Sequence, residues 1–513
     1  MTRRPAAPKH TGKSPPRGER TPAKRSKWDN SGFDPSAPVE RHPIPLWPAF
    51  AITFLCGVVY LGVGSGWTFR FQQSTYNHHI LTAYAWLQGR VYLTAADIES
   101  QYIRNWFGRA GRSVPADWNR DQLWQAYRNA KAPAMRQRNF SEAQIDQESR
   151  NTLNRAFHDW VHLGDRYYAY WPPLPAMIAL PFVAVSGPGA SDILIANLLG
   201  TATAFFVFLM LRGLRPLWPS LTAPACAAMT LFYCLGTCHM YQACLGQVWY
   251  LTQLAGTLML IISAWLGLKA IERPGWLIPA GAALGLGFLG RNTIILAAPM
   301  FAVILWMAVR SSPDWMRRYL GWGTGFALTL VAAIGVQLGL NQARFGDPLD
   351  FGQGHLADQG GNPRFRDEFK QHGRFNWYYV DRNLYYYFVN PLPRKYPART
   401  PAQEGWTFDP MGNSLFLISP PMLYFFLCWR QKRRDLLAAV LAGAIPGTVA
   451  LMFFHGTGWY QFGQRYLLDT MPLLLILAAF GVRGRLTWPL GGMILWSFAV
   501  NAWGTYRFSL EQV

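Results

Sequence analysis

The feature that most constrains this chain is a series of apolar runs long enough to cross a lipid bilayer. The first covers residues 47–67, and similar runs recur almost to the end of the 513 residues. A helix of about 20 residues crosses the hydrocarbon core of a bilayer, which is about 30 Å thick. Within lipid the backbone must satisfy its own hydrogen bonds, as a helix does. The pattern therefore predicts an all-α polytopic membrane protein with about eleven full spans and one partial span, a bundle of about 11–12 transmembrane helices.

The further apolar runs are 176–185, 193–211, 221–241, 248–268, 276–290, 293–309, 320–340, 415–429, 436–454, 466–482 and 486–501. Basic residues mark three of their junctions: Arg212 and Arg215, Lys269 and Arg273, and Arg310 with Arg317 and Arg318. Because Lys and Arg gather in cytoplasmic loops, we expect all three junctions on the cytoplasmic side. That requires the run 176–185 to end without completing a crossing, which its short length and flanking prolines favour. The alternative is that this run crosses fully, which would place all three basic junctions outside and the second large loop inside. Such loops also account for the formal charge of +21, and we expect no nucleic-acid partner.

This topology divides the chain into six parts. We expect residues 1–46, rich in Pro, Lys and Arg, to form a disordered basic cytoplasmic tail. The other parts are the first span 47–67, an extracytoplasmic loop 68–171, a transmembrane bundle 172–340, a second extracytoplasmic loop 341–413 and C-terminal spans 414–513. In the first loop the apolar pattern predicts a helix on the membrane surface over 78–89 and further helices around 98–107 and 120–130.

The richest group of reactive side chains lies where the first loop returns to the membrane, in residues 158–175. Asp159 and Asp165 are candidates for a general base, since a carboxylate near a low-dielectric surface can have its pKa raised towards the working pH. The alternative is that both are solvated loop acids. His158 and His162 are four residues apart, so on a helix they would share a face. A divalent metal held by these histidines stays an alternative, and the sequence defines no certain cofactor.

Two arginines at the ends of apolar runs are candidates for binding a phosphate. Arg291 separates two runs, and Arg465 precedes the run that ends near residue 482. Charged side chains at membrane depth are costly and usually functional, and a guanidinium group can hold a phosphate with two parallel hydrogen bonds. The alternative for Arg465 is a local ion pair with Asp469, four residues later. No nucleotide-phosphate loop occurs, which favours a donor other than a soluble nucleotide sugar.

Several of these segments together resemble the GT-C glycosyltransferases, the membrane class that includes the protein mannosyltransferases and the lipid A aminoarabinose transferases. The matching segments, spread over most of residues 47–485, are 85–90, 164–175, 246–250, 341–352 and 458–468. The resemblance implies a polyprenyl-phosphate sugar as donor and a reaction at the outer membrane face. Members of the class usually carry an acidic pair just after the first span. Here that place reads Asn77-His78-His79, and Asp159 replaces the pair by position and chemistry.

The sequence thus suggests an inverting glycosyltransferase of a bacterial plasma membrane, multi-pass, with its N-terminus in the cytoplasm. The acceptor would be a hydroxyl group of a lipid, glycan or protein. The expected catalytic residues are Asp159, Asp165, His78 and His79, and the expected substrate-binding residues are Asn77, Arg166, Tyr168, Trp249, Arg291, His455, Gln461, Arg465 and Tyr466. A transporter or flippase of lipid-linked sugars is the alternative from another class, and a non-catalytic binder of such lipids is a third.

Overall fold

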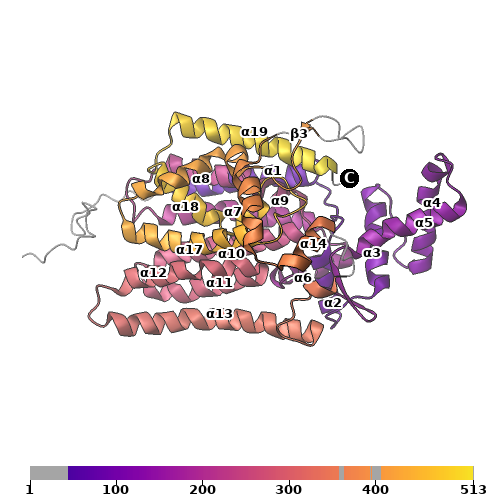
Figure 1. Ribbon diagram of the computed structural model, residues 1–513, viewed down its shortest axis with the longest axis horizontal. Helices are drawn as coiled ribbons and strands as arrows, with labels where there is room; N and C mark the ends of the chain where they lie inside the picture. Colours follow the sequence, from indigo (N-terminus) through magenta and orange to yellow (C-terminus); the bar gives the residue numbers. More distant parts are fainter. Residues whose placement is uncertain (1–43, 357–362, 393, 396–405, 512–513) are drawn as a thin grey trace, which may run out of the picture. The chain divides into compact units, whose positions relative to one another are not determined.

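The computed structural model describes residues 44–356, 363–392, 394–395 and 406–511. Residues 1–43, nearly all of the expected tail, lie outside this range. Six helices of the described chain are long and apolar enough to cross a membrane: α1 (Trp47–Gly64), α7 (Asp192–Gly213), α10 (Val248–Ala270), α12 (Ala298–Val309) with the preceding η4 (Asn292–Ala297), α13 (Trp315–Phe345) and α17 (Arg434–Phe453). The protein has an all-α polytopic membrane fold, in which these helices run side by side (Figure 1).

Shorter apolar helices complete the bundle. They are α6 (Leu174–Ser186) with η2 (Gly187–Gly189), α8 (Ala223–Leu235), η3 (Pro274–Trp276) with α11 (Leu277–Gly290), and α18 (Met471–Gly481). The bundle also contains α9 (His239–Leu245) and the long α19 (Trp488–Glu511). The span predicted over 415–429 is instead a short helix, α16 (Leu415–Ile418), followed by the 3₁₀ helix η9 (Pro420–Arg430). Pro420 and Pro421 interrupt the α-helix there because proline has no backbone N–H to donate.

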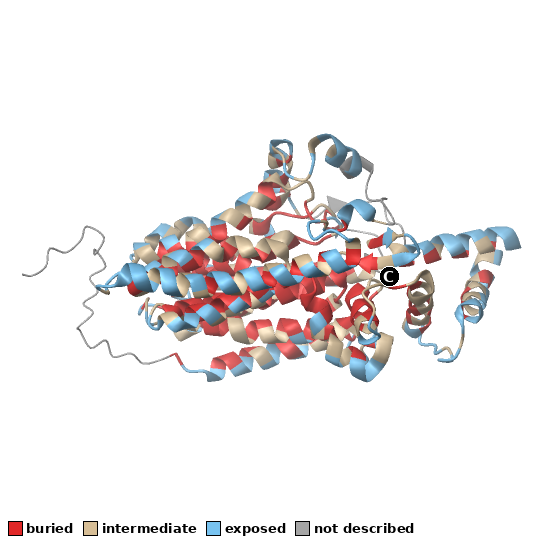
Figure 2. Cartoon of the chain, turned by 90° about the horizontal axis from the view of Figure 1, so that it is seen from below, coloured by how far each residue is buried: buried red, intermediate tan, exposed pale blue. Residues whose placement is uncertain are grey.

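Helix α10 forms the centre of the bundle and α13 one edge of it (Figure 1). Of the most apolar 18-residue stretch of each, 83% is buried in α10 and 17% in α13. Small residues allow the close approach of α10 to α11: a Cβ on Gly256 would lie 2.9 Å from the Cβ of Arg291, and one on Gly290 would lie 2.7 Å from the backbone nitrogen of Gly256. Figure 2 shows the buried residues concentrated inside the bundle.

The short helix α6 does not cross the bundle, as the charge pattern predicted. Its 13 residues span about 20 Å, less than the roughly 30 Å of a bilayer core. Both of its ends lie beside the large loops: Trp171, just before it, accepts a hydrogen bond from Arg344 (3.1 Å), and Pro188 and Ala190, just after it, accept hydrogen bonds from Gln73 (2.6 and 2.7 Å).

The basic junctions gather at the opposite end of the bundle. Arg212 donates to the carbonyl of Ile44 (2.7 Å), and Arg310 pairs with Asp435 (2.9 Å). The two large loops meet at the other end, where Val161 of the first loop forms an antiparallel bridge with Leu356 of the second. Both loops therefore lie at one end of the bundle, and the junctions of Arg212 and Arg310 lie at the other.

The first loop contains more structure than the sequence predicted. Its helices are α2 (His78–Leu87), α3 (Ala95–Arg109), α4 (Arg120–Arg136) and α5 (Glu142–Leu153), followed by η1 (Asn154–Phe157) and a hairpin of β1 (Trp160–Leu163) and β2 (Arg166–Ala169). Helices α2, α3 and α4 match the three expected ones. Helices α3, α4 and α5 each begin at a capping box, formed by Thr94 with Asp97, Asn119 with Gln122 and Ser141 with Gln144. The helix α5 and the hairpin were not predicted.

The second loop begins later than predicted because α13 continues to Phe345, where Gly346 ends it with φ of +77°. Its described elements are η5 (Gln353–His355), α14 (Pro363–His372), η6 (Trp377–Tyr379), α15 (Val380–Leu384), the π-helical η7 (Tyr385–Val389), and the short antiparallel strands β3 (Arg394–Lys395) and β4 (Trp406–Thr407). The 3₁₀ helix η10 (Arg465–Asp469) precedes α18.

Candidate functional site

The β1–β2 hairpin determines where the acids of residues 158–175 lie. Its strands pair antiparallel, with Trp160 opposite Ala169 and Leu163 opposite Arg166. Gly164, at φ of +64°, and Asp165 form the two-residue turn. The Asp165 side chain is 94% exposed and lies 3.8 Å from Arg166. The hairpin therefore places Asp165 at an exposed tip and leaves Asp159 at its base, next to the bundle.

The expected helical face of His158 and His162 is wrong, because His162 belongs to β1. Its ring stacks on Tyr167 at 4.4 Å between centroids. Within the described ranges, no group of three or more His, Cys, Asp or Glu side chains is arranged to hold a metal ion.

Asp159 is held against the first turn of α10. The indole N–H of Trp249 donates to the carboxylate of Asp159 at 2.8 Å. The His158 ring lies 3.9 Å from the same oxygen, and the Tyr76 ring packs on both Trp249 and His158. The Asp159 side chain is 17% exposed, so this carboxylate is oriented by a neutral donor and still open to a small reactant.

The histidines after the first span support this arrangement. The His78 ring stacks on Trp160 (4.4 Å), and its Nε2 lies 2.9 Å from the carbonyl oxygen of His158. His79 is buried, with Nε2 3.1 Å from the carbonyl oxygen of Val248. A carbonyl can only accept, so this nitrogen carries the proton. Burial lowers the pKa of His79 to about 3, which makes its ring a very weak base. His79 thus joins α2 to α10 as a neutral group.

Two arginines face the same region from the ends of α11 and η10. The side chain of Arg465 is buried, its Nε donates to the carbonyl of Gly458 (2.9 Å), and its guanidinium group lies 5.1 Å from the Tyr466 ring centroid. Arg291 donates through Nε to both oxygens of Asp469, at 3.1 and 2.9 Å, and its guanidinium group lies 4.8 Å from the centroid of the same Tyr466 ring.

The alternative of an Arg465–Asp469 pair is not formed. Asp469 is engaged by Arg291 and by the hydroxyl of Thr293. In a 3₁₀ helix, with three residues per turn, positions four apart point in different directions, so η10 separates the two side chains. Among the described residues Arg465 has no acidic partner within ion-pair distance.

Tyr170, which the sequence did not single out, interacts electrostatically with these groups. Burial raises the pKa of its hydroxyl well above the usual range; Asp159 and Tyr466 raise it further, whereas Arg465 and Arg291 lower it. The hydroxyl therefore lies within the electrostatic reach of one carboxylate and two guanidinium groups.

Arg374, in the second loop, is a further cation that interacts electrostatically with this hydroxyl. Burial lowers the pKa of Arg374 and Tyr170 raises it. The guanidinium group lies 6.0 Å from the Phe369 ring centroid, and it forms no ion pair within the described chain. We call Asp159, Tyr170, Arg291, Arg374 and Arg465 the arginine site.

The other expected residues divide into two groups. Trp249 and Tyr466 contact the arginine site directly. His455 lies beside it, since the backbone N–H of His455 donates to the backbone carbonyl of Arg374 (2.9 Å). Burial and the nearby Arg374 and Arg382 lower the pKa of His455 to about 4.

Residues of the second group lie in the surrounding structure. Asn77 is the buried N-cap of α2, and Tyr168 packs edge-on against Phe345. Arg166, which begins strand β2 of the hairpin, lies over the Tyr92 ring. Gln461 is fully buried and donates to the carbonyls of Met411 (2.9 Å) and Thr457 (2.7 Å). The structure thus joins Asp159, Trp249, Arg291, Arg465 and Tyr466, and leaves Asp165 and Arg166 apart on the hairpin.

Fold and site define an all-α polytopic membrane protein with a cationic, tyrosine-lined site where its two large loops meet. No protein-family model matches the chain, and no curated protein matches it. Among solved structures the chain is similar to the Archaeoglobus fulgidus oligosaccharyltransferase in its apo form, and to the archaeal oligosaccharyltransferase AglB from Archaeoglobus fulgidus in complex with an inhibitory peptide and a dolichol-phosphate. Both have 12% sequence identity and a TM-score of 0.39, over 90% and 89% of this chain and 56% of the other. The chain thus spans a little over half the length of these structures, and the function has to be inferred from the site itself.

Proposed function

We propose that this protein is a membrane glycosyltransferase that moves a sugar from a polyprenyl-phosphate donor to an acceptor hydroxyl group. The observation that carries the proposal is the arginine site, in which the charges of Arg291, Arg465 and Asp159 all act on the Tyr170 hydroxyl and Arg374 interacts with the same hydroxyl. Arg291 and Arg465 lie at the ends of bundle helices, and Arg374 lies in the second loop. Asp469 balances the charge of Arg291, whereas Arg374 and Arg465 have no acidic partner among the described residues. A phosphate group would supply the missing negative charge.

The charge of the site fits the leaving group better than the donor. A phosphodiester carries one negative charge, and the phosphate monoester released by transfer carries roughly 1.5 to 2 at neutral pH. Guanidinium groups held in place before the reaction attract the phosphate more strongly as its charge grows, and this preference lowers the barrier. Within the described chain Arg291 and Arg465 each use only Nε for hydrogen bonds. Their terminal nitrogens can thus bind a phosphate with two parallel hydrogen bonds.

Asp159 is the group we assign to proton abstraction. Its carboxylate takes the proton of the acceptor hydroxyl as that oxygen forms a bond to the anomeric carbon of the sugar. The bond from this carbon to the phosphate oxygen breaks on the opposite face, and the polyprenyl phosphate leaves with both electrons. A positioned base of this kind typically contributes about 10²–10⁴-fold in rate. Trp249 holds the carboxylate in place, and neutral His79 fixes α2 against α10.

The depth of the site suits a lipid-linked donor. Trp249 lies in the first turn of α10, Arg291 follows α11, and Arg465 lies just before α18. Helix ends are where the bilayer core gives way to the headgroups, so a phosphate in the arginine site can keep its polyprenyl tail in lipid. The non-crossing helix α6 lies beside this region and would border the tail.

The membrane side also belongs to the proposal. Short junctions rich in Lys and Arg, gathered at one end of the bundle, are typical of a cytoplasmic face. We infer a plasma-membrane protein whose N-terminus is cytoplasmic and whose arginine site faces outwards. The donor sugar reaches the site from the outer leaflet, and the acceptor is a lipid, glycan or protein.

The experiment that tests the function uses the purified full chain with a radiolabelled polyprenyl-phosphate sugar and a membrane extract as acceptor. Transfer of label into the extract, lost in Asp159→Asn, is the expected result. Binding of the donor with no transfer would instead indicate a non-catalytic binder. Movement of labelled lipid across vesicles that contain the protein, again with no transfer, would indicate a flippase. Arg485→Gln, an exposed arginine at the opposite end, is the matched control and should transfer normally.

A further inference from the structure

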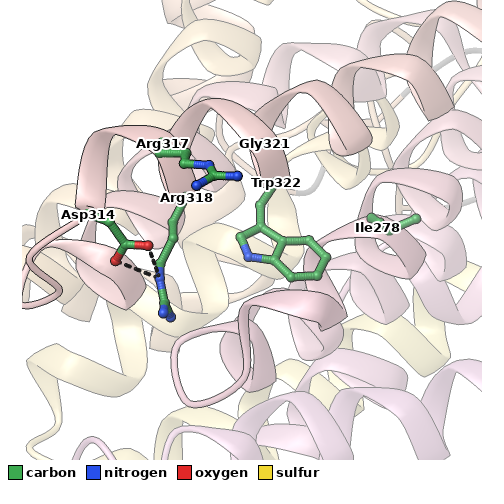
Figure 3. Close-up of a pocket in the computed structure, with 6 residues that line it drawn as sticks. All are labelled: Ile278, Asp314, Arg317, Arg318, Gly321 and Trp322. Atoms are coloured by element: carbon green, nitrogen blue, oxygen red, sulfur yellow. Dashed lines mark hydrogen bonds and ion pairs between the residues drawn. The ribbon is translucent and has the colours of Figure 1, made fainter.

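A second cationic site lies at the basic end of the bundle, far along α13 from the arginine site. Ile278, Asp314, Arg317, Arg318, Gly321 and Trp322 line an open pocket with a volume of about 350 Å³ (Figure 3). It lies between the first turns of α13 and the beginning of α11. The proposed transferase chemistry does not use this pocket.

The pocket combines charged side chains with an apolar wall. Arg318 donates through Nε to both oxygens of Asp314, at 2.9 and 3.1 Å. Arg317 is exposed and forms no hydrogen bond or ion pair with any residue that the structure describes. The three side chains thus leave one net positive charge. Trp322 and Ile278 supply the apolar surface (Figure 3).

The position of the pocket along α13 matches the depth profile of a lipid. The 31 residues of α13 extend for about 46 Å, more than the roughly 30 Å of a bilayer core. Its first turns therefore reach the headgroup layer. Trp322 follows Arg317 by five positions, or about 8 Å along the helix axis, which places the indole ring nearer the acyl chains.

The surroundings of the pocket indicate that this part of α13 faces lipid rather than protein. The flanking Leu320 and Met316 are 61% and 51% exposed. Trp276 and Trp315 also lie partly exposed at this end, and Lys269 lies over the Trp276 ring at 4.7 Å. Tryptophan with basic residues at helix ends is the composition of a membrane interface.

We propose that this pocket binds the headgroup of an anionic phospholipid of the bilayer. Arg317 contacts the lipid phosphate, the Asp314–Arg318 pair flanks it, and Trp322 with Ile278 packs against the upper acyl chain. Basic pockets between transmembrane helices are known to hold anionic headgroups. The net charge of +1 favours a lipid with one negative charge over a zwitterionic one.

The test is native mass spectrometry of the full chain in detergent, titrated with phosphatidylglycerol or with phosphatidylcholine of the same acyl chains. Wild-type protein should retain phosphatidylglycerol preferentially. Arg317→Gln should weaken that binding about five-fold, the effect of one basic residue near an anionic lipid surface. Arg485→Gln, at the same end but outside the pocket, should bind like wild type. A thermal unfolding curve of each variant, recorded without added lipid, checks that the fold is intact.

Asp314→Asn should have the opposite effect to Arg317→Gln on the affinity for phosphatidylglycerol. It frees Arg318 from its ion pair, and it removes no capping hydrogen bond because Asp314 makes none. Phosphatidylglycerol should therefore bind more tightly to this variant. Equal retention of the two lipids, wild-type binding by Arg317→Gln, or an equal loss in Arg485→Gln would overturn the proposal. So would displacement of the lipid by millimolar inorganic phosphate, since that would indicate a site for free phosphate.

Discussion

Replacing Arg465 by glutamine tests whether this guanidinium group stabilises the leaving phosphate. The side chain is 4% exposed, and only its Nε is engaged by the protein, at the carbonyl of Gly458. The terminal nitrogens can donate two charge-assisted hydrogen bonds to phosphate, each contributing about 1.5–3 kcal/mol. Loss of about 3 kcal/mol in the transition state corresponds to a roughly 150-fold lower kcat/KM. Because the attraction grows as charge develops, most of the loss should appear in kcat.

The assay is initial-rate transfer from labelled polyprenyl-phosphate sugar over a range of donor concentrations. Arg465→Lys keeps the charge without the paired donors, so its rate should lie between those of wild type and Arg465→Gln. Arg485→Gln is the control. Since the Gly458 hydrogen bond is also lost, each variant needs a thermal unfolding curve, in which we expect a cost of about 1 kcal/mol.

Arg374→Gln repeats the test without that complication, because the Arg374 side chain makes no hydrogen bond to any described residue. It should lower kcat with little change in thermal stability. If Arg465→Gln and Arg374→Gln, both folded, kept kcat/KM within about two-fold of wild type, the assignment of phosphate stabilisation to these arginines would be refuted.

Three further outcomes are expected. Asp159→Asn should reduce kcat by about 10²–10⁴-fold while leaving the dissociation constant of the donor unchanged in equilibrium binding; weakened binding with normal kcat would contradict its role as a base. Asp469→Asn should destabilise the protein by about 3 kcal/mol in thermal unfolding, because it leaves the Arg291 charge without its acidic partner, and adding Arg291→Gln should recover part of that loss. The pKa of His79 is lowered from 6.5 to about 3 in the folded protein, so below pH 6.5 the unfolded chain binds one more proton at this residue than the folded chain does. The contribution of His79 to the free energy of unfolding should therefore be constant above pH 6.5 and fall by about 2 kcal/mol between pH 6.5 and 5. His79→Gln should flatten this slope in unfolding curves, and an unchanged slope would show that His79 is not held neutral.

The membrane fold could be predicted because hydrophobic length and the distribution of basic residues act on the whole chain. The non-crossing α6 is an example: its own sequence is ambiguous, but only a turn-back places the three basic junctions on the side of the basic N-terminal tail, which the distribution of Lys and Arg marks as cytoplasmic. The local backbone conformation was harder to predict where prolines interrupt an apolar run. The span over 415–429 has the composition of a crossing helix, and the Pro420-Pro421 pair converts most of it to a 3₁₀ helix.

The hairpin shows what sequence reasoning overlooked. Gly164 and Asp165 form a two-residue turn between short runs rich in aromatic and β-branched residues, which is a recognised hairpin signal. Recognising this hairpin from the sequence would have placed Asp165 in the turn and Asp159 at the base of the hairpin. Arg374 and Tyr170 carried no such signal. They are about two hundred positions apart in the chain and become neighbours only because the two loops fold against each other, which local patterns do not record.

The central claim is that the arginine site holds the phosphate of a polyprenyl lipid, and photo-crosslinking tests it most directly. The probe is a polyprenyl phosphate with a diazirine on the first isoprene unit, applied to the full chain in membranes and mapped by peptide mass spectrometry. We expect cross-links in 170–176 and 465–469, competed by unlabelled polyprenyl-phosphate sugar and reduced in Arg465→Gln. Cross-links confined to the basic end around Arg317 and Trp322, or cross-links near Tyr170 that the donor does not compete, would contradict the claim.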